Sequence, residues 1–277
     1  MSDPIYDLHC HSTASDGALP PAELVGRAKL QGVDVLALTD HDTVAGLAEA
    51  RQAAQDCGMR LIQGIELSAG FESHCLHIVG LNIDPTNGQL LEGIGRQQIT
   101  REDRAQKIAQ KLVKKGIPDA YPELRAAAGN GEITRLHFAD FLVKHGYVAT
   151  QQDAFDRYLS KGKPGYVPTA WAPLAECVAW IRQAGGVAVL AHPLRYKLST
   201  KWLDKALGQF KAAGGQGIEV VTGRASIDDI RLSYGFALKH QLYASQGSDF
   251  HAPGNQYLEL GRLAAMPAGA NPVWDLF

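Results

Sequence analysis

The chain has 277 residues, of which 45% are hydrophobic and 20% charged, and its formal net charge is −2 at pH 7. This length and composition suit a globular protein with a full hydrophobic core, and the near-neutral charge argues against bulk attraction to nucleic acid or to a membrane. The four cysteines form no CxxC pair and no apolar run approaches about 18 residues, so we expect a cytoplasmic protein without a secretion signal or membrane span.

Strands and helices alternate in the first part of the chain. The first predicted helix begins with prolines and ends on Gly32, which suits a helix C-cap. Thr43 can cap the second helix, which Gly58 ends. Short apolar runs rich in β-branched residues and leucine predict the strands between them. The expected strands cover residues 5–10, 33–40, 59–68 and 74–83, and the expected helices cover residues 19–32 and 43–58.

The pattern changes to helical periodicity without a convincing buried strand over residues 89–165, which we interpret as a helical insertion. The alternation then resumes. Its expected strands cover residues 187–192, 217–221 and 242–249, and its expected helices cover residues 173–186, 202–215 and 226–241. About seven mostly parallel strands favour an α/β fold of the (β/α) barrel type over an open sheet. The barrel would comprise residues 1–88 and 166–277.

Two histidines one residue apart, in "DLHCHSTASDG", would point to the same face of the first strand. Such a pair is a weak signal alone, but nearly every later strand ends with a histidine or an acidic residue. The strand ends of a barrel converge on one face, where so many buried ionisable groups would be destabilising unless cations neutralise them. The residues concerned are His9, His11, Asp16, Asp40, His41, Glu66, His77, His192, Glu219, Asp249 and His251.

The motifs "DLHCHSTASDG", "LALTDHD", "GIELS", "LHIVGL", "LAHP" and "GSDFH", in this order, resemble those of the PHP (polymerase and histidinol phosphatase) family of metal-dependent phosphoesterases. The resemblance covers the whole chain. Within the family, the chain is most similar to the bacterial nucleoside 3′,5′-bisphosphate phosphatases, also described as 5′→3′ exoribonucleases on short RNA, because the insertion carries "TRLHFADFLVKHG" and "YLSKGKPGYV". The resemblance implies a distorted (β/α)7 barrel with the helical insertion between strands four and five.

The resemblance also implies three adjoining metal positions that hold two or three ions. The first would use His9, His11, Glu66 and Asp249; the second would share Glu66 and add His77 and His192; the third would use Asp16, His41 and His251. Some family members have histidine where this chain has Asp16. Imidazole and carboxylate ligands without thiolate favour Mn²⁺, with Zn²⁺ or Fe²⁺ as alternatives. We expect Asp40 either to orient an imidazole or to cap the following helix.

Clustered divalent cations suit the hydrolysis of a phosphate ester. We expect His192, Asp249 and His251 to take part in catalysis, with His192 or His251 able to give a proton to the leaving ribose oxygen. The predicted reaction removes the 3′-phosphate from nucleoside 3′,5′-bisphosphates and extends to the 5′→3′ trimming of short 5′-phosphorylated RNA. No membrane partner is expected, and no protein partner can be inferred.

A substrate with two phosphates needs a second group of cations. Arg135 and His137 on the insertion are the first candidates to bind this phosphate, and Lys161 and Arg195 are further ones. The basic face formed by residues 104, 107, 111 and 114 could follow an RNA backbone, although such a face is more often a solvated surface.

Two other functions stay open at this point. The first is a small-metabolite phosphatase, such as one for histidinol phosphate, against which the "TRLHF" insertion argues. The second is a nucleic-acid-binding module whose metal site is a non-catalytic remnant, against which the intact ligand set argues.

Overall fold

The strands form one sheet in which each strand lies beside its neighbour in sequence. The computed structural model describes residues 3–129, 131–254 and 258–277. Within them the sheet has seven strands in the order β1-β2-β3-β4-β5-β6-β7. Their bounds are β1 (Tyr6–Asp7), β2 (Val35–Leu38), β3 (Arg60–Phe71), β4 (His74–Leu81), β5 (Val187–Leu190), β6 (Gly217–Thr222) and β7 (Tyr243–Gly247).

The sheet closes on itself where the segment after β1 meets β7 and the segment that follows β7. The amide of Leu8 donates to the carbonyl of Gln246 over 3.1 Å, and the amide of Asp249 donates to the carbonyl of His9 over 2.8 Å. Cys10 forms a parallel bridge with Phe250. These contacts confirm the predicted α/β barrel with seven strands.

The sheet is mostly parallel, as expected, with one antiparallel strand. The ladders β1–β2, β2–β3, β5–β6 and β6–β7 are parallel, but β4 is antiparallel to both of its neighbours. Only two residues separate Phe71 from His74, and so short a connection can join only antiparallel strands. His77 therefore lies in the first half of β4 rather than near its C-terminal end, where we expected it.

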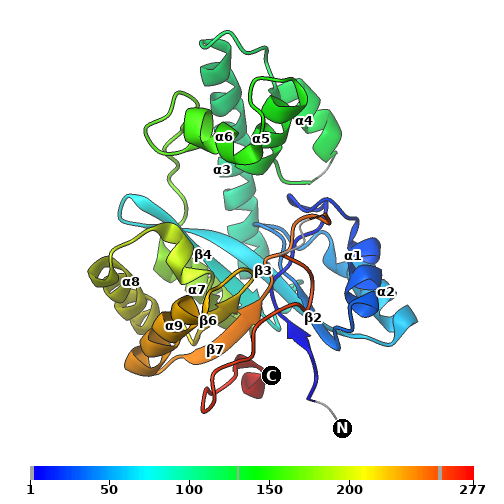
Figure 1. Cartoon of the computed structure of the whole chain (residues 1–277), viewed down its shortest axis with the longest axis vertical. Coiled ribbons are helices and arrows are strands. Elements are labelled where there is room, and N and C mark those ends of the chain that lie inside the picture. The colour runs from blue at the N-terminus through cyan, green and yellow to red at the C-terminus, as the bar shows by residue number, and fades with distance from the viewer. Residues whose placement is uncertain (1–2, 130, 255–257) are drawn as a thin grey trace.

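The barrel helices cover the outside of the sheet, with α1 and α2 on one side and α7, α8 and α9 on the other (Figure 1). Their bounds are α1 (Pro21–Leu30), α2 (Leu47–Cys57), α7 (Leu174–Gln183), α8 (Thr200–Ala212) and α9 (Ile227–His240). Gly32 and Gly58 have φ of 82° and 65° where α1 and α2 end, as predicted. Among the described residues, none of the helices is long and apolar enough to cross a membrane.

The predicted cap of α2 is wrong. The helix begins at Leu47 after Gly46, which provides no side-chain cap, and Thr43 lies in the preceding loop. There its hydroxyl accepts a hydrogen bond from the amide of Ala45 over 3.2 Å. The loop is longer than the sequence pattern indicated because the chain first continues alongside β3, where His41 forms a parallel bridge with Glu66 and the amide of Asp42 donates to the carbonyl of Glu66.

The helices between β4 and α7 gather at one end of the barrel (Figure 1). They are α3 (Gly88–Val113), α4 (Tyr121–Ala128), α5 (Arg135–Lys144), α6 (Gln151–Ala154) and the π-helix η1 (Phe155–Leu159). They have a hydrophobic cluster of their own, which includes Leu112, Phe138 and Leu142, whereas Leu90 and Ile94 in the first half of α3 belong to the barrel core. We propose that residues 89–165 form a separate unit, with α3 shared between the two cores.

The tight packing of α3 on α7 can be tested at Gly93. A β-carbon there would lie 2.5 Å from the ring of Trp180, whereas one at Gly95 would have no neighbour within 4 Å. We expect Gly93→Ala to lower the free energy of unfolding by about 1–3 kcal/mol because it overpacks this contact. The matched control Gly95→Ala should instead raise it by about 0.5–1 kcal/mol, since alanine is the better helix former. Urea unfolding followed by circular dichroism measures both, and equal effects would contradict the packing.

Candidate metal centre

The predicted metal ligands meet at one rim of the barrel. His9 and His11 follow β1, and their ring centroids are 5.1 Å apart, while Cys10 between them is buried in the core. This is the alternation expected of extended backbone. Of the other predicted ligands, Glu66 and His77 lie within β3 and β4, and the rest lie in the segments that follow strands. The rest are Asp16, His41, His192, Asp249 and His251.

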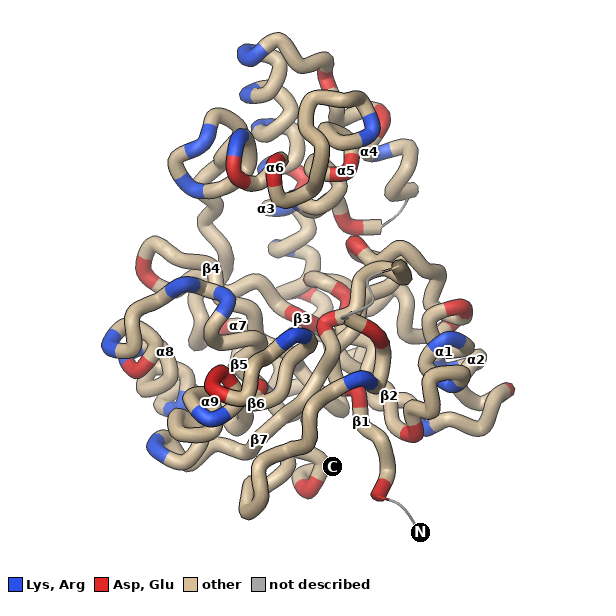
Figure 2. Tube along the Cα trace, viewed as in Figure 1, with Lys and Arg blue, Asp and Glu red and all other residues tan. Residues whose placement is uncertain are grey.

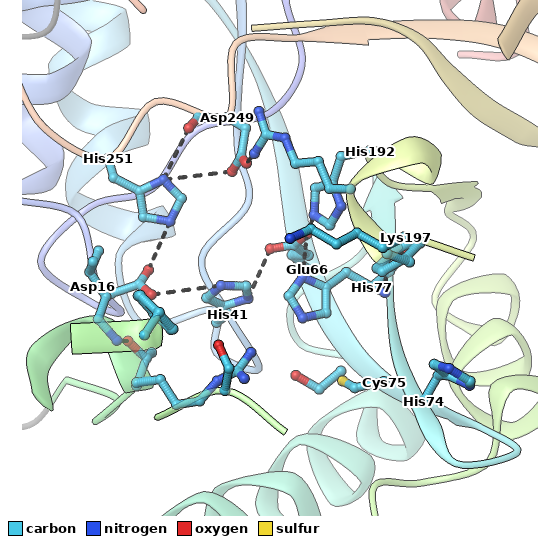
Figure 3. Close-up of a pocket in the computed structure, with 18 of the residues that line it drawn as sticks. Asp16, His41, Glu66, His74, Cys75, His77, His192, Lys197, Asp249 and His251 are labelled. Atoms are coloured by element: carbon cyan, nitrogen blue, oxygen red, sulfur yellow. Dashed lines mark hydrogen bonds and ion pairs between the residues drawn. The ribbon is translucent and has the colours of Figure 1, made fainter. Parts of the chain in front are cut away.

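Glu66 lies at the centre of this rim and is completely buried. Figure 3 shows three labelled imidazoles, those of His41, His77 and His192, directed toward its carboxylate. The shortest distances from imidazole nitrogens to its oxygens are 2.8 Å for His41, 3.0 Å for His77, 3.1 Å for His192, 3.3 Å for His9 and 3.4 Å for His11.

A second group of donors surrounds Asp16 (Figure 3). Its carboxylate oxygens lie 3.4 Å from Nε2 of His251 and 3.7 Å from Nε2 of His41. Asp249 lies between the two groups, because its Oδ1 is 3.2 Å from Nε2 of His11 and 3.6 Å from Nδ1 of His251.

The donor atoms fit divalent cations. Nε2 of His9 and Nε2 of His11 face each other at 3.1 Å, and Nδ1 of His41 and Oε2 of Glu66 are buried without a hydrogen bond although only 2.8 Å separates them. Among the described residues, three groups have donor atoms that all lie within 4.8 Å of one another. They are His9, His11 and Glu66; His41, Glu66 and His77; and His11, Asp16, His41 and His251.

Considered without a cation, the imidazoles differ: His11 loses its proton readily, whereas His77 keeps a proton that compensates the charge of Glu66. Burial, together with the nearby His251, lowers the pKa of His11 to about 3. Burial also opposes a charge on His77, but Glu66 outweighs it and raises the pKa of His77 to about 10. Burial would raise the pKa of Glu66, yet the imidazoles of His77 and His41 hold it well below its usual value. Cations that replaced these protons would keep the same balance of charge.

Glu219 of β6 forms hydrogen bonds with two of the predicted ligands. Its Oε1 accepts a hydrogen bond from Nδ1 of His9 over 2.7 Å, and its Oε2 accepts one from the backbone amide of His192 over 2.6 Å. With Nδ1 donating, the lone pair of the His9 ring lies on Nε2, which faces the cluster. The sequence placed Glu219 at this rim but gave it no role.

Asp40 has one of its two expected roles excluded, since it does not cap the following helix. Its carboxylate accepts hydrogen bonds from the amide and hydroxyl of Ser12 and from the hydroxyl of Ser15, each over 2.7 Å. It thus fixes the loop that presents Asp16. Capping of α2 is wrong, because the helix begins only at Leu47. The hydroxyl of Ser15 also lies 3.5 Å from Nδ1 of His11, so orientation of this imidazole by Asp40 through Ser15 stays a prediction.

Two supporting residues were missed. Asp7 is buried and accepts hydrogen bonds from the amides of Ser248 and Gly261 over 2.8 Å and 2.9 Å. At Gly247 a β-carbon would lie 2.3 Å from Cβ of His9, so the chain can pass the ligand this closely only without a side chain. The acidic residue in "DLHCH" and the glycine in "GSDFH" are the only sequence signals for either.

A cavity of about 2050 Å³ opens above the ligands and extends to the insertion. Arg135, Lys161 and Arg195 line it, as their predicted role in substrate binding requires. Arg195 forms an ion pair with Asp249, and Lys161 donates to the hydroxyl of Ser73 over 3.3 Å.

His137 is not among the residues that line this cavity. Its Nδ1 accepts a hydrogen bond from the amide of Thr134 over 3.1 Å, which completes a capping box at the start of α5. Its role in substrate binding stays a prediction.

Arg104 on α3 lines the same cavity as Arg135. Burial, together with Arg135 and Arg101, lowers the pKa of Arg104 to about 9, and its Nε atom is buried without a hydrogen-bond partner. Crowded guanidinium groups of this kind favour an anion. Further along the basic face, Lys107 pairs with Asp103 on the same helix.

Comparisons with known proteins agree with this geometry. The family model of the PHP domain matches residues 7–160. The chain is 46% identical over 272 residues to a 5′-3′ exoribonuclease of Haemophilus influenzae, covering 98% of each chain. It is 44% identical over 269 residues to a 3′,5′-nucleoside bisphosphate phosphatase of Chromobacterium violaceum, covering 97% of this chain and 94% of the phosphatase.

The fold agrees as well. A solved structure from Chromobacterium violaceum, described as an amidohydrolase with bound sulfate and no metal, matches with a TM-score of 0.93 at 43% identity. The match covers 98% of this chain and 95% of the other. The matches to the family model, to the relatives and to the solved structure agree with one another. The chain belongs to the PHP domain family.

Proposed function

We propose that this protein is a metal-dependent phosphoric monoester hydrolase that removes the 3′-phosphate from nucleoside 3′,5′-bisphosphates. The observation that carries the proposal is a single cavity with a histidine–carboxylate cluster at its floor and crowded arginines at its insertion side. The relatives named as a bisphosphate phosphatase and as an exoribonuclease support it. The same arrangement would trim short 5′-phosphorylated RNA from its 5′ end.

We assign the ligands to three adjoining positions, of which two or three hold ions. They are His9, His11, Glu66 and Asp249; Glu66, His77 and His192; and Asp16, His41 and His251. The ligands favour Mn²⁺, with Zn²⁺ or Fe²⁺ as alternatives. Bound divalent cations would act as Lewis acids that stabilise the charge developing on the phosphoryl oxygens.

The protein's own side chains would complete the reaction. Arg195 reaches Asp249 from the cavity wall, so its guanidinium lies where it can also donate to a phosphoryl oxygen. His192 and His251 both border the cavity, and either can give the leaving ribose oxygen a proton when the nitrogen facing it is not a ligand.

The second phosphate would bind at Arg104 and Arg135. These two cations share the insertion side of the cavity, and each has its pKa lowered by burial, so an anion between them removes an unfavourable concentration of positive charge. A 5′-phosphate held there would present the 3′-phosphate to the metal centre. Lys161 would add a further cation at the edge of this site. We place the reaction in the cytoplasm, which suits the four free cysteines.

The substrate can be tested by phosphate release from the Mn²⁺-loaded protein. We expect phosphate release from adenosine 3′,5′-bisphosphate, which leaves 5′-AMP, to be faster than phosphate release from 3′-AMP, 5′-AMP or histidinol phosphate. Only the bisphosphate engages both ends of the cavity. Faster release from histidinol phosphate would favour the small-metabolite phosphatase. Binding of RNA without hydrolysis of any ester would favour the non-catalytic module.

The ligand assignment can be tested with His9→Ala and Asp249→Ala. Each removes a donor from the centre of the cluster, so we expect kcat to fall at least about 100-fold while the circular dichroism spectrum is unchanged. His145→Ala is the matched control, since this histidine pairs with Glu123 on the surface of the insertion. Full activity in either of the first two variants would reject the assignment.

The second phosphate site can be tested with Arg135→Ala. Loss of a charge-assisted hydrogen bond should raise KM for adenosine 3′,5′-bisphosphate about 10-fold or more while KM for 3′-AMP changes little. Arg157→Ala serves as the control, because Arg157 on η1 donates to the carbonyl of Tyr147 and does not line the cavity. Equal increases for both substrates would contradict a role in holding the 5′-phosphate.

A further inference from the structure

Asp42, the second acidic residue of "TDHD", is buried and has a strained backbone conformation. The proposed reaction gives this residue no role. Its φ is 49°, a backbone conformation that residues other than glycine adopt only at a cost in free energy. Its Oδ1 accepts a hydrogen bond from the amide of Ser68 over 2.8 Å. Its Oδ2 accepts one from Nε of Arg101 over 2.6 Å. The conformation is therefore held by β3 on one side and by the insertion on the other.

Arg101 reaches this place from α3. Only 5% of its side chain is exposed, and its Nη2 donates to the hydroxyl of Ser68 over 2.8 Å. One turn earlier, Gln97 donates to the carbonyl of Ser68 and accepts from the amide of Ala172 over 3.2 Å. The insertion is thus tied into the barrel rim by a buried polar network rather than by apolar contacts alone.

This network adjoins two of the proposed ligands. Asp42 directly follows His41, and the amide of Asp42 donates to the carbonyl of Glu66 over 2.9 Å. Ser68 lies two residues after Glu66 on β3, so its side chain is on the same face of the strand. A shift of Asp42 would move the backbone from which His41 projects.

A second part of the insertion contacts the loop that presents Asp16. The amide of Glu132 donates to the carbonyl of Ala14 over 3.1 Å. At Gly131 a β-carbon would lie 2.6 Å from the carbonyl oxygen of Thr13, so the two loops touch through their backbones.

We propose that the helical insertion positions the cation site formed by Asp16, His41 and His251, with Arg101 as the positioning residue that acts through Asp42 on His41. The inference rests on the proposed metal centre and deepens it. His9 and His192 are held by Glu219 from within the barrel, so their positions do not depend on the insertion. Loss of Arg101 would therefore weaken the cation site that includes His41 more than the sites that include His9 and His192.

A purely structural role of Arg101 would have a different signature. It would lower the midpoint of thermal unfolding without changing the number or affinity of the bound ions. Direct binding of Mn²⁺ in the absence of substrate separates the two, because it does not depend on catalysis.

The experiment titrates Mn²⁺ into wild type and Arg101→Leu and measures free Mn²⁺ by electron paramagnetic resonance. We expect Arg101→Leu to weaken one class of Mn²⁺ site about 10–100-fold, as does the loss of other partners that orient metal ligands, with the other classes changed much less. Arg96→Leu is the matched control, since Arg96 also lies on α3 and forms an ion pair with Glu176 over 3.3 Å, away from the ligands. It should bind Mn²⁺ as wild type does.

Arg101→Lys and Asp42→Asn extend the test in case Arg101→Leu does not fold. Arg101→Lys keeps the charge but loses the forked geometry, and Asp42→Asn keeps the shape but loses the charge, so each should weaken the same site to an intermediate degree. Unchanged Mn²⁺ binding in the folded variants would overturn the inference. Failure of wild type to bind Mn²⁺ would instead overturn the proposed metal centre on which it rests.

Discussion

The arrangement of the barrel rim depends on the burial of the Glu66 carboxylate among imidazoles. An isolated buried carboxylate is strongly unfavourable, so positive charge has to be supplied within a few ångströms. The antiparallel β4 serves this need, because it brings His77 within 3.0 Å of Glu66 across the β3–β4 ladder. Glu219 then orients His9 from behind, and Asp40 holds the loop of Asp16. The negative charges of these carboxylates are balanced only when protons or cations are bound beside them.

The barrel and the helices between β4 and α7 carry complementary chemistry. The barrel contributes carboxylates and imidazoles, whereas Lys and Arg recur along α3 and the neighbouring helices (Figure 2). Arg104 lines the cavity, and Arg101, one turn away on the same helix, reaches the rim of the candidate metal centre. The net charge of −2 gives no hint of this separation, because the two contributions nearly cancel.

Local patterns predicted most of the barrel and the residues that meet at its rim. Strand alternation places His9 and His11 together, and parallel strands bring distant ends to one face, so both follow from short stretches of sequence. The direction of β4 was missed because a two-residue turn and a longer connection look alike in an apolar pattern. The capping roles expected of Asp40 and Thr43 were wrong because the loop before α2 packs on the rim, which only tertiary contacts show.

Supporting residues were the least accessible to sequence reasoning. Asp42 looks like any polar residue before a helix, and Arg101 looks like one more charge on a basic helix. Only the fold shows that these two, 59 positions apart, form a buried pair beside His41.

The most direct test of the metal centre is anomalous diffraction at the manganese absorption edge from crystals grown with Mn²⁺. The structure predicts anomalous peaks among Nε2 of His9, Nε2 of His11 and the carboxylates of Glu66 and Asp249. A map without a peak there, at saturating Mn²⁺, or with peaks only at exposed carboxylates such as Asp228, would contradict it.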